Sequence, residues 1–447
     1  MGLGFAIAFN VADTYFVGQL GADDLAALSA CFPVIFAVIG VAMGLGTGAS
    51  AVISRAIGKG DMDEVRRLTT DTIILAFFIT VVMVLILWSA FDLVFELMDV
   101  PPKLMPLVRE YMYIWMPGSV FLVPPMLGNF ALRATGDTKT PSIIMGVAVG
   151  INFILDPLLI FGLWFVPGLG LAGAAIATLI GRAFTLFASW YFLSRKYEMI
   201  CYTFSLREFF VSTRNVLQVG LPSAITSLVM PIGIFVVMGL VFEFGAEAGA
   251  AVGAASRVET LMFVPLMALG GVMSPFIGQN LGARNTDRIK DSLKTALLFS
   301  VGWSVFTYLV LYLFRHQIAP LFSDGNLTVE KFMVIYLAIQ PIGIIFRGLT
   351  IVTTTTLNVL KRAWVSFFIN LFQTIIIYLP LAYLFKEEYG FEGIFWASVL
   401  TSVLVSIAAL IILKRESGRL ETYMDTEKVH DARLDETLEE EPNKEKR

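Results

Sequence analysis

Long apolar segments run through almost the whole of this 447-residue chain. An α-helix needs about 20 such residues to cross a lipid bilayer. The chain has 57% hydrophobic and 15% charged residues. Soluble proteins have roughly 45–50% apolar and about 25% charged residues. This excludes a soluble enzyme or a nucleic-acid-binding protein. We expect an all-α, polytopic membrane protein of twelve transmembrane helices, at residues 1–18, 25–53, 69–91, 106–132, 141–163, 170–194, 215–241, 248–277, 292–314, 329–357, 364–385 and 391–413.

The distribution of basic residues predicts the orientation in the membrane. The loops that follow even-numbered segments, counted with the adjoining first residues of the next segment, carry 16 Lys and Arg residues, whereas those that follow odd-numbered segments carry 5. Short cytoplasmic loops are enriched in these residues, so both termini are predicted to lie in the cytoplasm, with the protein in the cell membrane. The tail, residues 414–447, holds 8 basic and 11 acidic residues and is predicted to be solvated and disordered.

The two halves of the sequence align with each other. An internal repeat with six helices in each copy predicts two lobes in the same orientation, related by a pseudo-twofold axis along the membrane normal, as in many transporters. The lobes are expected at residues 1–205 and 206–413. The first segment of the first lobe begins about ten residues later than the first segment of the second lobe, residues 215–241. Residues 21–27 and 57–66 match 245–251 and 281–290 at an offset of 224, as Pro117 matches Pro341; Pro157 matches Pro380, and residues 170–173 match 390–393.

Two carboxylates lie inside predicted membrane spans. Asp13 follows Asn10 by three residues, and Asp156 follows Asn152 by four, so each acid shares a helix face with an amide. An Asp at the centre of a membrane helix costs about 2.5–3.5 kcal/mol on insertion scales. Pro157 has no amide hydrogen and leaves a backbone carbonyl without its helical partner. Oxygen-rich patches of this kind are suited to a hard cation.

The repeat provides an internal control for these acids. Asp13 corresponds to Val237 and Asp156 to Leu379, and both amides correspond to isoleucines. Since the second half does without the acids, the fold does not need them, and we interpret them as the site of a coupling ion. The alternative is that these polar residues fix helix packing.

Other polar residues within the spans are less specific. Glu259 and Arg257 are expected to form an ion pair with a neighbouring helix, or to contact a substrate. Gln340 and Arg347 are seven residues apart and share a helix face, so with Glu259 they are candidate cavity-lining residues. Arg182 is expected to extend to the membrane surface or to pair internally.

Three glycines in the second segment, Gly44, Gly46 and Gly48, resemble a nucleotide-binding loop only superficially. No strand precedes them and no Lys-Ser or Lys-Thr pair follows. Close helix packing is the better interpretation.

Four motifs resemble those of the multidrug and toxic compound extrusion (MATE) family, and the resemblance covers about residues 1–413. They are Asp-Thr-Tyr-Phe-Val-Gly-Gln-Leu-Gly at 13–21, Leu-Arg-Ala-Thr-Gly-Asp-Thr-Lys-Thr-Pro at 132–141, Asn-Phe-Ile-Leu-Asp-Pro at 152–157 and Gly-Gln-Asn-Leu-Gly-Ala-Arg-Asn at 278–285.

The resemblance implies a V-shaped antiporter that exports cationic amphipathic compounds in exchange for sodium or protons. It implies that the ion binds at Asp13, Asn152, Asp156 and Thr178. Asn10 is a further candidate because it shares a helix face with Asp13. Val237 and Leu379 place the chain nearer the branch whose coupling site is in the first lobe only. Beyond the coupling ion no cofactor or metal is expected. The expected partners are small amphipathic molecules and membrane lipid, with the protein acting as a monomer.

Two other functions stay open on the sequence. A flippase for a lipid-linked precursor would need several basic residues to hold a pyrophosphate, but the spans contain few, namely Arg182, Arg257 and Arg347. An integral membrane enzyme would need a metal or nucleophile cluster, which is hard to build from two His and two Cys, with no His-Glu-x-x-His motif.

Overall fold

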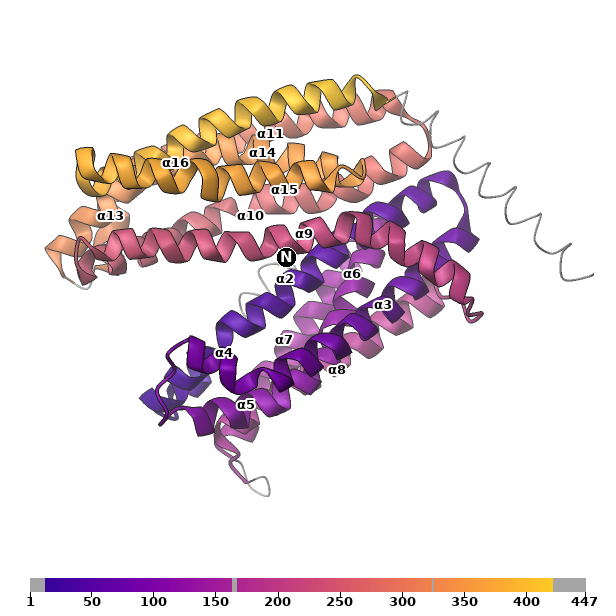
Figure 1. Cartoon of the computed structure of the whole chain (residues 1–447), viewed down its shortest axis with the longest axis horizontal. Helices are drawn as coiled ribbons and strands as arrows, with labels where there is room; N and C mark the ends of the chain where they lie inside the picture. Colours follow the sequence, from indigo (N-terminus) through magenta and orange to yellow (C-terminus); the bar gives the residue numbers. More distant parts are fainter. Residues whose placement is uncertain (1–12, 163–166, 324, 421–447) are drawn as a thin grey trace, which may run out of the picture. The chain divides into compact units, whose positions relative to one another are not determined.

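The computed structural model describes residues 13–162, 167–323 and 325–420, and all regular elements within these ranges are helical (Figure 1). The long helices are α2 (Ala22–Lys59), α3 (Met62–Ser89), α7 (Lys139–Ile160), α8 (Gly170–Tyr191), α9 (Leu206–Phe242), α10 (Ala246–Gly282), α11 (Thr286–Leu313), α14 (Ile342–Val359) and α16 (Leu379–Ser417). The shorter ones are α4 (Phe91–Leu97), α5 (Met105–Gly118), α6 (Val123–Ala134), α12 (Arg315–Phe322), α13 (Leu327–Ile339) and α15 (Ala363–Leu371), with a 3₁₀ turn η1 (Ser119–Phe121) and two π-helical stretches, η2 (Phe192–Lys196) and η3 (Phe372–Tyr378).

Nine helical stretches within the described ranges are long and apolar enough to cross a membrane. The all-α prediction is confirmed, but some of the predicted segments are not single helices. Segment 106–132 is divided by η1, and segment 329–357 is divided between α13 and α14. The second break lies at Pro341, because proline lacks the amide that would continue the helical hydrogen bonds. Pro117, its counterpart in the repeat, lies inside α5, two residues before η1 begins. Of segment 1–18, only the helical residues 13–18 lie within the described ranges.

The internal repeat extends to the helix boundaries. Helices α3 and α11 each contain 28 residues and begin 224 positions apart, at Met62 and Thr286. Helices α4 and α12 likewise begin at Phe91 and Arg315. The same offset in independent elements supports a duplication of the six-helix sequence unit.

The turns before α3 and α11 also match. Gly60 and Arg284, 224 positions apart, both have a left-handed backbone, with φ of 80° and 57°. The following residues, Asp61 and Asn285, each cap their helix by accepting a hydrogen bond from the backbone amide three residues later, at 2.8 and 3.2 Å. The two turns therefore share their geometry, although one uses glycine and the other arginine.

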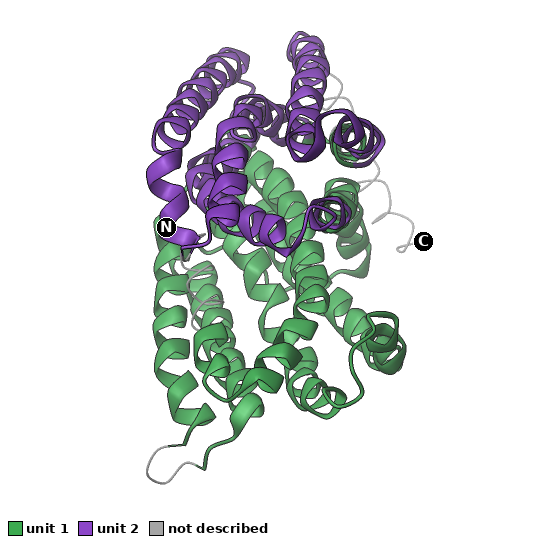
Figure 2. Ribbon diagram, turned by 90° about the vertical axis from the view of Figure 1, so that its left-hand side faces the viewer, with its two compact units in different colours: residues 1–235, 274–276, 358–374 green, residues 236–273, 277–357, 375–447 purple. Residues whose placement is uncertain are grey.

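The chain divides into two compact units, coloured separately in Figure 2. Unit 1 comprises residues 1–235, 274–276 and 358–374, and unit 2 comprises residues 236–273, 277–357 and 375–447. Each unit has its own apolar core. In unit 1 the core includes Phe95, Met112 and Leu127, and in unit 2 it includes Met333, Ile394 and Phe395. The lobe boundary predicted at residues 205 and 206 stays a prediction.

The glycines of α2 provide close helix packing within unit 1, as predicted. A Cβ atom on Gly44 would lie 2.2 Å from the backbone nitrogen of Ala224 in α9, and one on Gly48 would lie 2.4 Å from the carbonyl oxygen of Val216. A Cβ on Gly46 would meet an aromatic ring at 2.2 Å. Side chains at the first two positions would force the backbones of α2 and α9 apart.

Asp137 organises the loop between α6 and α7. Its carboxylate accepts hydrogen bonds from the backbone amides of Lys139 and Thr140 at 2.8 and 3.0 Å, and from the hydroxyl of Tyr197. The ammonium group of Lys196 lies 3.4 Å away. Burial by itself raises the pKa of Asp137, but the hydrogen bonds from Thr140, Tyr197 and Lys139 outweigh it and hold the pKa well below its usual range.

We expect Asp137→Asn to lower the stability of the protein by about 1 kcal/mol at neutral pH. The amide nitrogen that replaces Oδ2 cannot accept the hydrogen bonds that the hydroxyls of Thr140 and Tyr197 donate, and one such bond contributes about 0.5–1.5 kcal/mol. Because the folded-state pKa is depressed, the stabilisation is present above the unfolded pKa of about 3.9 and is lost as the pH falls through the lower folded value. Thermal unfolding in detergent should thus separate the variant from wild type equally at pH 6 and pH 8. A difference that disappears between those two values would contradict this account.

Candidate coupling-ion site

The predicted ion-binding residues come together inside unit 1. Asn152 and Asp156 lie one turn apart on the same face of α7. Thr178 lies on α8, and Asp13 lies in the helical residues 13–18 that precede α2. Asn10 lies outside the described residues. Three separate stretches of the chain therefore supply the site, which explains why no short sequence motif contains all of it.

The side chains of this cluster contact one another directly. The Thr178 hydroxyl donates a hydrogen bond to Asp13 Oδ2 at 3.3 Å, and Asn152 Nδ2 donates one to Asp156 Oδ1 at 3.0 Å. The carboxyl groups of Asp13 and Asp156 lie within hydrogen-bonding reach of each other. Asp156 and Asn152 are fully buried, and Asp13 is 8% exposed. The two acids therefore share one small polar space instead of facing water separately.

Three oxygens of the cluster need a further partner. Asp13 Oδ1, Asn152 Oδ1 and Asp156 Oδ2 are buried and have no hydrogen-bond partner in the described part of the chain. A buried polar atom without a partner costs free energy, and a buried carboxylate costs far more. Hard cations such as sodium prefer oxygen ligands of this kind, and a proton shared between the acids would also satisfy two of them. The residues present therefore fit either coupling ion.

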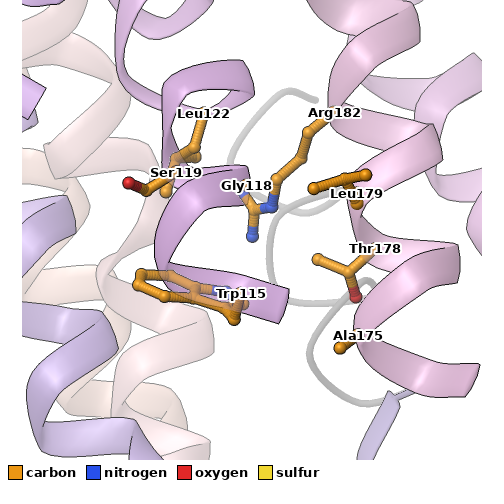
Figure 3. Close-up of a pocket in the computed structure, with 8 residues that line it drawn as sticks. All are labelled: Trp115, Gly118, Ser119, Leu122, Ala175, Thr178, Leu179 and Arg182. Atoms are coloured by element: carbon orange, nitrogen blue, oxygen red, sulfur yellow. The ribbon is translucent and has the colours of Figure 1, made fainter. Parts of the chain in front are cut away.

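A small pocket adjoins this cluster, between α5 and α8 (Figure 3). Thr178 is one of the residues that line the pocket, and its hydroxyl donates a hydrogen bond to Asp13. Arg182 follows Thr178 by one helical turn and extends into the same pocket (Figure 3). Its guanidinium interacts electrostatically with Asp13 and with the buried Tyr111. The residues that line the pocket are Trp115, Gly118, Ser119, Leu122, Ala175, Thr178, Leu179 and Arg182.

The sequence alone does not place Arg182 in this site. Internal pairing is one of its two predicted roles, and the interaction of Arg182 with Asp13 is of that kind. The available signal was the spacing of four residues between Thr178 and Arg182, which places both on one face of a helix.

The candidate cavity residues of the second half lie in unit 2. Glu259 in α10 accepts a hydrogen bond from the Tyr336 hydroxyl at 2.5 Å and one from Arg347 Nη1 at 2.9 Å. The guanidinium of Arg347 also lies 4.7 Å from the ring centre of Phe263. Glu259 thus forms an ion pair with a residue of a neighbouring helix, as the sequence suggests. Its partner is Arg347 of α14. Gln340 directly follows α13, at its C-cap position, and its buried side-chain oxygen has no partner among the described residues. A cavity-lining role for these residues stays a prediction.

We expect Glu259→Gln to destabilise the protein by about 3 kcal/mol, because Arg347 then loses its charge partner in a largely buried place. The double variant Glu259→Gln/Arg347→Met should recover part of this loss. The matched control is Glu243→Gln, which removes the Lys386–Glu243 pair at 2.7 Å, where Glu243 is 53% exposed, and should cost less than about 1 kcal/mol. Equal losses of thermal stability for the two single variants would contradict the assignment.

Comparison with known proteins supports a transporter. The MatE family model matches residues 5–158 and 222–384 of the chain. The FAD transporter of Shewanella oneidensis is 34% identical over 417 residues, which cover 93% of this chain and 92% of that protein. The multidrug export protein MepA of Staphylococcus aureus is 23% identical over 420 residues, covering 93% and 91%.

Solved structures agree with this assignment. The Vibrio cholerae MATE transporter VcmN in its bent form is similar over 94% of this chain and 95% of that one, with 26% identity and a TM-score of 0.89. From the family match over most of its length, together with these relatives, the chain belongs to the MatE family of membrane transporters.

Proposed function

We propose that this protein is a secondary active antiporter that exports an organic solute in exchange for sodium or protons. The ion binds at Asp13, Asn152, Asp156 and Thr178, and both chain termini lie in the cytoplasm. Three buried oxygens at two adjacent carboxyl groups support this proposal most directly. None of the three oxygens has a hydrogen-bond partner in the described part of the chain. The second unit has apolar residues at the corresponding positions, Val237 and Leu379.

The site couples transport to an ion gradient through its charge. Two carboxylates this close repel each other in a low-dielectric environment unless a cation or a proton lies between them. Binding of the ion therefore changes the interactions that join the residue 13–18 helix, α7 and α8. For antiport, the ion must bind better to one conformation of the transporter and the exported solute to the other.

The relatives suggest two classes of exported solute. Cationic amphipathic drugs are favoured by the multidrug relatives, among them MepA, at 23% identity. A flavin dinucleotide is the second candidate, favoured by the FAD transporter at 34% identity over nearly the whole chain. The two differ in the sign of their charge, so one experiment can separate them.

The test uses everted membrane vesicles from cells that express the full chain. Sodium and pH gradients are imposed separately, and uptake of ethidium and of FAD is followed by fluorescence. Vesicles from cells with an empty vector supply the background. We expect one of the two gradients to drive uptake of one of the two solutes above this background, and collapse of that gradient by an ionophore to stop it. If neither gradient drives uptake of either solute in vesicles that contain the folded protein, the proposed function is wrong.

A further inference from the structure

The charged residues of the coupling site number three, not two. Arg182 lies on the same face of α8 as Thr178, one turn further along, and its side chain enters the pocket that Thr178 also lines (Figure 3). Thr178 is hydrogen-bonded to Asp13 at 3.3 Å, so this side chain links the pocket to one of the two carboxyl groups. The guanidinium of Arg182 interacts with Asp13 through its charge.

The repeat shows that these three charges occur together. Asp13 and Asp156 correspond to Val237 and Leu379, and Arg182 corresponds to Ser402, at the offset of 220 that relates Gly170 to Gly390. This register is supported by the backbone, since Gly170 and Gly390 both have a left-handed φ, of 53° and 61°. Where the acids are missing, the arginine is missing as well. An arginine needed only for packing of this helix would be expected in both copies.

We propose that Arg182 is a fixed counter-charge of the coupling site and limits it to one monovalent cation per transport cycle. This inference rests on the proposed antiport function. A guanidinium stays protonated in proteins, so it offsets one of the two carboxylate charges throughout the cycle. One further positive charge, from sodium or a proton, then makes the cluster neutral. Without Arg182 the same two acids would need two cations, because an uncompensated charge in a buried site is costly.

Arg182 is thus a positioning residue, which acts on the ion by offsetting one of the two carboxylate charges. The number of ions exchanged per transport cycle is the quantity that tests this role. The protein is reconstituted into proteoliposomes, with ethidium or FAD as the transported probe, whichever the vesicle assay identifies. Valinomycin clamps the membrane voltage to zero, and a series of gradients of the driving ion is imposed. At each ion gradient we measure the opposing probe gradient that stops net flux of the probe. The slope of the logarithm of the probe gradient against that of the ion gradient gives the number of ions exchanged.

For wild type we expect a slope of about one. Arg182→Gln should raise the slope towards about two and strengthen binding of the driving ion more than tenfold, whereas Arg182→Lys should keep a slope near one because it keeps the charge. The control Arg133→Gln removes an arginine of unit 1 that lies 4.8 Å from the ring centre of Phe130, and its slope should equal that of wild type.

A wild-type slope of two, or an Arg182→Gln protein with the slope and ion affinity of wild type, would overturn the proposal. If Arg182→Gln does not fold, a wild-type slope of two still overturns the proposal. Failure of the antiport function itself looks different, since no gradient of either ion then drives any probe flux.

Discussion

Asp156→Asn should reduce ion-driven export roughly a hundredfold or more while leaving the protein folded. The substituted amide keeps the shape of the side chain and still offers an oxygen to Asn152, whose amide donates to Asp156 at 3.0 Å in wild type. What is lost is one of the two carboxylate charges that would hold the ion. Removing one partner from a buried charge interaction costs about 3–5 kcal/mol, and each 1.4 kcal/mol is about a tenfold change in affinity. Asp13→Asn should behave in the same way.

The measurement is uptake into everted vesicles at matched protein levels, with thermal unfolding as the check on folding. Binding of the exported solute in detergent should survive, since the substitution acts on the ion. A second-site variant, Leu379→Asp in the Asp156→Asn background, should not restore transport, because the counterpart of Asn152 is Ile375, which has no amide. Normal export by either asparagine variant would show that the ion binds elsewhere.

Gly44→Ala should strongly reduce the amount of folded protein. The added Cβ would lie 2.2 Å from the backbone nitrogen of Ala224 and 2.3 Å from its Cα, so helices α2 and α9 must move apart. Overpacking of this kind costs about 1–3 kcal/mol and more where the backbone must shift. Small residues at helix contacts matter especially in membranes, where packing is a main source of association between helices.

Gly253→Ala is the matched control for this prediction. Gly253 is also a helical glycine, in α10, but nothing lies within 4 Å of an added Cβ. Alanine is the better helix former by about 1 kcal/mol, so this variant should be as stable as wild type or slightly more so. Thermal unfolding of both variants in the same detergent gives the comparison. Equal stability of the two would mean that α2 and α9 do not need their close approach.

Most of the fold could be predicted because apolar length and repetition are properties of the sequence itself. The offset of 224 predicted a duplication, and the helix boundaries of α3 and α11 follow it. The different outcomes at Pro117, which lies inside α5, and Pro341, which separates α13 from α14, were less accessible. A proline can begin, bend or end a helix, and the outcome depends on packing. At Gly390 the backbone leaves the helical conformation, with φ of 61° and ψ of −140°, so that α16 consists of two helices joined at a kink. This break lies between the predicted segments 364–385 and 391–413.

The candidate site was predictable in part. The rarity of acids in apolar segments singled out Asp13 and Asp156, and helical spacing joined Asn152 to the second. Thr178 came only from the family resemblance, since a threonine in a membrane helix has no distinguishing cost. The spacing of Thr178 and Arg182 places both on one face of α8, but the approach of that face to Asp13 is a long-range contact that this local pattern does not encode.

Unit 1 contains segments that are far apart in the sequence, and this has a consequence for its assembly during biosynthesis. All described residues of the candidate coupling site have been synthesised once Arg182 is made. The unit that contains them also includes residues 358–374, which carry α15. At about 5–20 residues per second, roughly 10–40 seconds pass between these two points. During this interval the two acids lie in a partly assembled bundle, where chaperones and membrane proteases can reach it. Chains that end before α15 should therefore be degraded faster than chains that end just after it.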